Sequence, residues 1–172
     1  MADRDDSLRE HLRRLLDWQD AHAGFDDAVK DVPEALRATV PEGGAHSPWQ
    51  LLEHLRICQY DILDFCRNPK YVEVPMESYW PKSAAPPSAR AWDESIAAFR
   101  RDRDELKKLA ADRGLDLFAR IPHGTDRRTC GSCSWWPTTT PTTSASSWLY
   151  GAAWGTGRRP RTGPGWPSCA GW

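Results

Sequence analysis

The chain has 172 residues, of which 27% are charged, and a formal net charge of −1 at pH 7. This length suits one domain, or one domain with a tail, and the balanced charge argues against a nucleic-acid binder. The mean hydropathy is −0.68, and no stretch approaches the roughly 18 apolar residues of a membrane span. The acidic start, Met-Ala-Asp-Arg-Asp-Asp, is not followed by an apolar run, so we expect no export signal and a cytoplasmic protein.

The first predicted helix covers residues 7–31. Ser7 can act as the N-cap, and Glu10 can close a capping box three residues later. Apolar residues then follow at helical spacing and form one stripe: Leu8, Leu12, Leu15 and Leu16. We expect this helix to pass through the Ala23-Gly24 region and to stop before Pro33.

The second predicted helix covers residues 47–67 and has clear signals at both ends. Residues 47–50, Ser-Pro-Trp-Gln, supply an N-cap, a proline at the first helical position and a glutamine for a capping box. Residues 67–69, Arg-Asn-Pro, are a typical stop signal. Between them runs an apolar stripe: Leu51, Leu55, Cys58, Ile62 and Phe65.

A proline-rich crossover, residues 69–87, leads to the third predicted helix, residues 88–113. The aromatic and β-branched residues of the crossover indicate that it packs on the body: Tyr71, Val72, Val74, Tyr79 and Trp80. Gly114 is placed to terminate the third helix, although Arg103 interrupts its apolar stripe. Residues 115–122 are expected to form a short packed connection.

Three amphipathic helices with one long crossover need a fourth helix to close their core, and an up-down bundle is the usual solution. The fourth helix should follow residues 123–124, where the sequence instead changes its composition. Residues 1–124 hold one threonine, whereas residues 126–172 hold eight, together with six of the ten tryptophans. β-Branched residues and two prolines make residues 130–143 a poor helix. We therefore predict an all-α bundle over residues 1–125, with the fourth helix disrupted or replaced by a disordered tail, residues 126–172.

A shifted reading frame would restore the missing helix. If each codon begins at the third base of the present one, the codons for residues 135–143 are read differently. The first two shifted codons must encode Val and Ala, and each of the next six can encode one of only four amino acids. The string V-A-D-H-N-A-Y-H satisfies every position and contains H-x-x-x-H. Leucine-rich translations are possible on both sides of it. We interpret the tail as frameshifted from near Asp126, and the alternative is a natural Thr/Trp-rich tail.

The chain resembles the DinB-like superfamily. The resemblance depends on the motif at residues 47–55, the Trp80-Pro81 crossover, residues 92–99 and residues 121–124, Ile-Pro-His-Gly. It implies a four-helix bundle in which one histidine of the second helix and an H-x-x-x-H pair of the fourth hold a divalent metal, zinc or nickel. In this sequence only His54 corresponds to one of those ligands. His54 lies about 60° from the centre of the apolar stripe at 100° per residue, so its imidazole can lean toward one end of the bundle.

The same resemblance implies an activity and its partners. Relatives include bacillithiol S-transferases and a mycothiol-dependent maleylpyruvate isomerase, so the intact family points to a low-molecular-weight thiol and a small electrophilic substrate. A metal would lower the pKa of the bound thiol. We expect a metal-dependent thiol transferase or hydrolase by ancestry that is inactive in the present frame, because two of the three histidines are missing. The alternative is a non-catalytic helical scaffold or interaction protein, and a homodimer is left open.

Other residues with reactive side chains have simpler interpretations. Cys58 and Cys66 are expected to be small buried hydrophobes, and His46 and His123 to be structural or solvated. Asp61, seven residues after His54, could support that histidine from two turns away or lie on a solvated surface. The C-x-x-C motif at residues 130–133 could be redox-active or half of a zinc site, but it is accidental if the tail is frameshifted.

Overall fold

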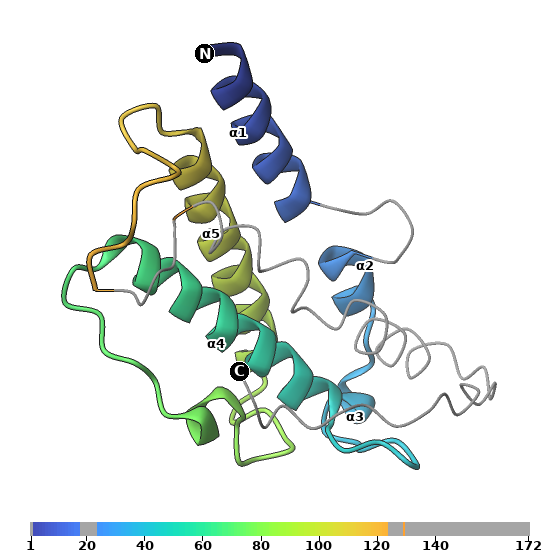
Figure 1. Ribbon diagram of the computed structural model, residues 1–172. Coiled ribbons are helices and arrows are strands. Elements are labelled where there is room, and N and C mark those ends of the chain that lie inside the picture. Colours follow the sequence, from blue (N-terminus) through green and yellow to red (C-terminus); the bar gives the residue numbers. More distant parts are fainter. Residues whose placement is uncertain (1, 18–23, 124–128, 130–172) are drawn as a thin grey trace.

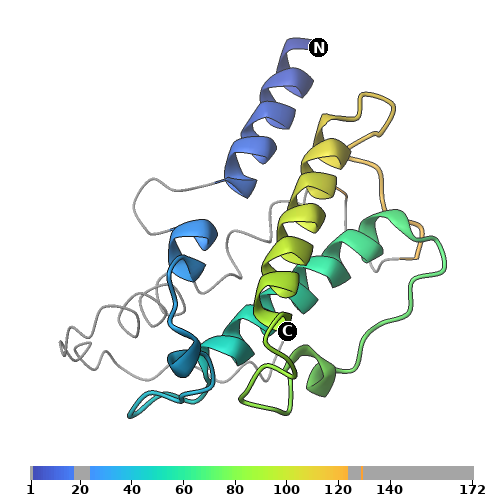
Figure 2. The same cartoon turned by 180° about the vertical axis from the view of Figure 1, so that it is seen from behind.

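The computed structural model describes residues 2–17, 24–123 and 129, and within them it is helical with no β-strand. Figures 1 and 2 show the long helices α4 and α5 crossing obliquely, with α1 beside one end of α5 and α2 beside the other. The all-α prediction is confirmed. The elements are α1 (Ala2–Leu16), α2 (Phe25–Val29), α3 (Glu34–Arg37), α4 (Pro48–Arg67), the 3₁₀ turn η1 (Met76–Tyr79) and α5 (Ala91–Ala111).

Helix α4 begins and ends where its local signals predict. The Ser47 hydroxyl accepts a hydrogen bond from the Gln50 amide (3.2 Å), and the Gln50 side chain accepts one from the Ser47 amide (3.1 Å). Both halves of the capping box are therefore formed, with Pro48 at the first helical position. At the other end the Asn68 amide donates to the Asp64 carbonyl (2.8 Å), and Pro69 follows.

The prediction of one helix over residues 7–31 is wrong at both ends. Helix α1 already begins at Ala2, so Ser7 lies inside it and does not cap it. The earlier start is stabilised by Asp5, whose carboxylate accepts from Arg9 four residues later (2.7 Å). Helix α1 ends at Leu16, and α2 is a separate short helix that follows Gly24. Residues 18–23, between the two, lie outside the described residues.

Helix α5 is shorter than the predicted range 88–113. It follows Arg90, which makes no side-chain cap, and ends at Ala111 rather than at Gly114. The Gly114 amide instead donates to the Asp112 side chain (2.8 Å), which closes a local turn after the helix. The end is set by Arg9 of α1, whose guanidinium donates to the carbonyl groups of Ala110 (3.1 Å) and Asp112 (2.6 Å).

The apolar core follows the length of α5 in three clusters. At its start, α5 packs with α4 and with the segment around α2 through Ala28, Val29, Val32, Trp49, Leu52, Ala91, Trp92 and Ile96. Leu16, Leu55, Leu63, Phe99 and Leu106 form the middle cluster, where the Phe25 ring stacks on Phe99. Leu12, Ala110 and Leu117 form the last one, between α1 and the connection that follows α5. The packed connection predicted at residues 115–122 is confirmed by the burial of Leu117 and Ile121.

The crossover leaves the end of α4 and runs back beside that helix before α5 begins (Figure 1). As a result, α4 and α5 point in the same general direction, whereas α1 runs the opposite way. Tyr79 and Trp80 pack on α4, as expected, but Val72 is 79% exposed and that part of the packing prediction is wrong. The predicted fourth helix and tail lie outside the described residues, apart from the buried Thr129. None of the described helices is long and apolar enough to cross a membrane.

Candidate metal-ligand site

His54 lies in the first half of α4 and is held by three neighbours. Its Nδ1 atom is 2.9 Å from the backbone carbonyl oxygen of Tyr79. Its ring stacks on Trp80, with centroids 3.8 Å apart and planes at 4°. The Cys58 sulfur, one turn later on α4, lies 3.7 Å from both ring nitrogens. These contacts fix the position and the plane of the imidazole.

The Tyr79 contact also fixes the protonation of the ring. A carbonyl oxygen only accepts hydrogen bonds, so Nδ1 must carry the proton in the neutral imidazole. Nε2 then keeps its lone pair, and its neighbour among the described residues is the Cys58 sulfur. A backbone carbonyl on one ring nitrogen and an unprotonated second nitrogen are the usual arrangement of a metal-ligating histidine.

The environment keeps His54 neutral and Cys58 protonated. Burial lowers the pKa of His54, the hydrogen bond to Tyr79 partly opposes this, and the charge on nearby His46 lowers it further. Burial, together with the negative charge of Asp61, raises the pKa of Cys58 to about 12. Cys58 is therefore a neutral thiol beside the imidazole and not a thiolate nucleophile, in agreement with its predicted role as a small hydrophobe.

Asp61 takes part in a polar cluster that ties the crossover to α4. Its two carboxylate oxygens accept hydrogen bonds from the Tyr71 hydroxyl (2.9 Å) and the Tyr79 hydroxyl (2.7 Å). The solvated-surface interpretation of Asp61 is therefore wrong. Burial and the hydrogen bond to Asp61 raise the pKa of Tyr71 to about 12, and they raise that of Tyr79 further. Both phenols stay protonated and act as donors.

Nearer the start of α4, two further side chains bind the crossover. The Ser47 hydroxyl donates to the carbonyl of Ala84 (2.6 Å), and the Gln50 amide group donates to that of Pro81 (3.1 Å). The capping box that starts α4 thus also fixes the second half of the crossover. Together with the Asp61 cluster, these bonds hold Tyr79 and Trp80 against His54.

The described residues supply one candidate ligand for a metal ion, His54, and not the full set that a metal centre needs. No group of three or more His, Cys, Asp or Glu side chains in the described part of the chain is placed to hold a metal ion. His54 donates from Nδ1 to a backbone carbonyl, as metal-ligating histidines do, and the Cys58 sulfur lies 3.7 Å from its ring nitrogens. A catalytic metal site needs three protein ligands. The two positions of the frame-restored H-x-x-x-H pair, near residues 139 and 143, lie outside the described residues.

The remaining sequence candidates have structural contacts. His46 stacks on Trp80 with centroids 3.8 Å apart. His123 donates from Nε2 to the Phe65 carbonyl (2.8 Å) and ties the final connection to the end of α4. Cys66 is half-buried and is not part of a disulfide among the described residues. The C-x-x-C motif at residues 130–133 lies outside the described residues.

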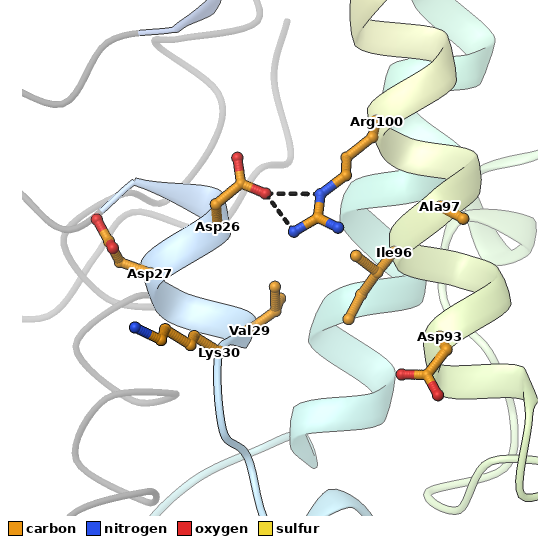
Figure 3. Close-up of a pocket in the computed structure, with 8 residues that line it drawn as sticks. All are labelled: Asp26, Asp27, Val29, Lys30, Asp93, Ile96, Ala97 and Arg100. Atoms are coloured by element: carbon orange, nitrogen blue, oxygen red, sulfur yellow. Dashed lines mark hydrogen bonds and ion pairs between the residues drawn. The ribbon is translucent and has the colours of Figure 1, made fainter.

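A separate cavity of about 350 Å³ lies between α2 and α5. Figure 3 shows the Asp26 and Arg100 side chains meeting across this gap, and their ion pair measures 2.7 Å. Val29 and Ile96 supply apolar parts of the lining. His54 and the residues that contact it do not contribute to this cavity, so the two features are independent. The sequence patterns did not predict the cavity, because it depends on how α2 is placed against α5.

These features define a class: all-α proteins with a long crossover that binds a histidine of a core helix. The family model of the DinB superfamily matches residues 17–138. The match covers more than half of the chain, and the protein belongs to the DinB superfamily. Comparison with curated proteins and with solved structures gives no significant match. The family prediction is therefore confirmed.

Tyr79 and Trp80 are the site residues whose role the sequence did not predict. Both were expected to pack, but nothing in the spacing of the crossover indicates that they contact His54. The Trp80-Pro81 pair contributed to the family resemblance, and this was the available signal. Only the backbone path of the crossover brings the Tyr79 carbonyl to the imidazole.

Proposed function

We propose that this protein descends from a divalent-metal-dependent enzyme of the DinB superfamily, of the thiol S-transferase or hydrolase type. We further propose that the chain in its present frame lacks that activity. The observation that carries the proposal is His54, whose Nδ1–H is bound to the Tyr79 carbonyl (2.9 Å) while Nε2 keeps its lone pair. The superfamily match supports the ancestry. The change of composition after Asp126 supports the loss of the other two ligands.

The nature of the metal follows from the expected donor set. Three neutral imidazoles suit zinc or nickel, and both carry over from the family as candidates. A low-molecular-weight thiol and a small electrophile are the proposed substrates. The half-buried Cys58 beside His54 is a neutral thiol, so the attacking sulfur would come from the substrate and not from this side chain.

The same contacts of His54 favour a second candidate function, a structural one. The bond to Tyr79 and the stacking on Trp80 hold the crossover against α4, a structural role that needs no metal. On this alternative the protein is a non-catalytic scaffold or interaction protein with a natural Trp-rich tail. Sequencing the gene around codons 125–130 from independent sources separates the two, since a lost or gained base appears only under the first.

Metal binding tests the proposal directly. The present chain and a frame-restored chain are purified and titrated with Zn²⁺ and with Ni²⁺, and bound metal is measured by mass spectrometry. The restored protein is expected to hold one metal ion per chain, and the present one none. His54→Ala in the restored chain should lower the affinity at least about tenfold, whereas His11→Ala, at an exposed position of α1, is the matched control. A restored protein that binds no metal, or a present chain that binds one tightly, refutes the proposal.

A further inference from the structure

We propose that Asp61 is a positioning residue for His54 and that it acts through Tyr79. By binding the Tyr79 hydroxyl, Asp61 holds the backbone carbonyl of the same tyrosine on Nδ1 of His54, so that Nε2 is the nitrogen left for a ligand. This inference rests on the proposed function for its purpose, since it assigns the residue that prepares the metal-ligating histidine. The linkage itself belongs to the chain as it stands.

The geometry of α4 makes the linkage possible. Asp61 follows His54 by seven residues, which is two helical turns, so both side chains lie on nearly the same face about 10 Å apart. Tyr79 spans that distance. Its carbonyl oxygen is 2.9 Å from His54 and its hydroxyl is 2.7 Å from Asp61. Tyr79 is therefore held at both its backbone and the tip of its side chain.

The Tyr79 carbonyl is available because of its place in the crossover. Tyr79 is the last residue of η1, Met76–Tyr79. Carbonyl groups in the last turn of a helix lack partners within the helix. The turn therefore ends with a free acceptor, and the imidazole N–H of His54 supplies the donor that satisfies it.

Asp61 holds the crossover at two points on either side of an exposed stretch. It binds Tyr71 before that stretch and Tyr79 after it. Between them, Val72 is 79% exposed and Met76 is 77% exposed. This stretch buries little apolar surface against α4, so burial contributes little to its order. The two phenol bonds to one carboxylate are the contacts that position it.

The two tyrosines offer a matched pair of variants. Tyr79→Phe removes the hydroxyl that holds the carbonyl in place, whereas Tyr71→Phe removes an equivalent hydroxyl from the same carboxylate but leaves the Tyr79 linkage intact. The full-length protein is labelled with ¹⁵N in its histidine rings, and the His54 signals are assigned by their loss in His54→Gln. Long-range ¹H–¹⁵N spectra at pH 8, where the imidazole is neutral, report the ratio of the Nδ1–H to the Nε2–H tautomer.

We expect the Nδ1–H tautomer to dominate in the parent protein and in Tyr71→Phe. In Tyr79→Phe the ratio should fall by about fivefold, the effect of weakening one ordinary hydrogen bond. Asp61→Asn should also lower it, because the phenols bind different carboxylate oxygens and one of these becomes an NH₂ group, which cannot accept a hydrogen bond. Circular dichroism confirms that each variant is folded at the temperature of measurement.

Two outcomes would overturn the inference. If the ratio is the same in Tyr79→Phe as in the parent, the Asp61–Tyr79 bond does not position His54. If Tyr71→Phe lowers the ratio as much as Tyr79→Phe, the effect is a general loosening of the crossover. Neither result depends on metal binding. Failure of the frame-restored protein to bind metal would refute the proposed function while leaving the tautomer result unchanged.

Discussion

Replacing Arg9 by methionine is expected to cost this protein much of its stability, although Arg9 is one of several arginines on α1. Its side chain is only 7% exposed. The guanidinium donates to the carbonyl oxygens of Ala110 (3.1 Å), Asp112 (2.6 Å) and Leu115 (2.7 Å), and Nε pairs with Asp5. Arg9 therefore caps the end of α5 from another helix. Of the three carbonyl groups, that of Asp112 also accepts from the Leu115 amide (3.2 Å).

The size of the effect follows from these bonds. A hydrogen bond from a charged donor contributes about 1.5–3 kcal/mol. Ala110 is fully buried, so we expect its carbonyl to stay shielded from water after the substitution, whereas those of Asp112 and Leu115 are near the surface and can be hydrated. Counting the first bond in full and the others in part, Arg9→Met should lower the free energy of unfolding by about 3–4 kcal/mol. Methionine keeps the apolar stem, so lost packing adds little.

Urea denaturation of the full chain measures this effect. Arg13→Met is the control, because Arg13 is 52% exposed and pairs with Glu10 at 3.2 Å, so its loss should cost less than about 0.5 kcal/mol. Arg9→Lys keeps the charge but reaches fewer carbonyl groups, and it should lie about midway between the parent and Arg9→Met. If Arg9→Met is within about 1 kcal/mol of the parent at equal m-value, the guanidinium is not the cap that holds α5.

Substitutions at two further residues test buried polar contacts. Partial burial raises the pKa of Asp26, but hydrogen bonds from Arg100 and Arg103 outweigh it, so the net pKa lies below its ordinary value. The stabilisation is then present above the unfolded-state pKa of about 3.9 and is lost as the pH falls through the lower folded-state pKa. Asp26→Asn should therefore cost about 1 kcal/mol at pH 7, and the cost should shrink as the solution is acidified through the lowered folded-state pKa; a cost that stays constant on acidification in urea titrations would contradict this. Gln59 is fully buried, and its Nε2 donates to the Phe99 carbonyl (2.6 Å) whereas its Oε1 has no hydrogen-bond partner among the described residues. Gln59→Met removes that bond together with the unpaired oxygen, so the two effects should offset and the free energy of unfolding should change by less than about 1 kcal/mol. Gln59→Glu should lower the stability by more than about 2 kcal/mol, and a methionine variant that is destabilised as much as the glutamate variant would contradict this reasoning.

The parts of the fold that depend on neighbouring residues were predicted from the sequence. Helix α4 begins at Pro48 and ends at Arg67 because its cap, its first-turn proline and its stop signal lie within a few residues of those ends. His54 was found by the family motif that surrounds it. The start of α1 was mispredicted because Ser7 offers a good cap, while the competing Asp5–Arg9 pair also favours helix over the preceding residues.

The parts that depend on distant residues were not predicted. Arg103 interrupts the apolar stripe of α5, and only the placement of α2 shows that it pairs with Asp26 at 2.9 Å. The same holds for Arg9, whose partners lie about a hundred residues away, and for Tyr79, whose carbonyl reaches His54 across the crossover. Charge spacing along one helix carries no information about such partners. They follow from the path of the chain.

The bonds between α4 and the crossover follow one another in reverse chain order. Ser47 binds Ala84, Gln50 binds Pro81, His54 binds Tyr79 and Asp61 binds both Tyr79 and Tyr71. An insertion or a deletion between positions 79 and 84 would shift the crossover carbonyl groups relative to their partners on α4, so some of these hydrogen bonds could not form. Between positions 72 and 78 the chain can change length while both anchoring tyrosines stay in place. Insertions and deletions among relatives of this protein should therefore be found in that stretch and be rare after Tyr79.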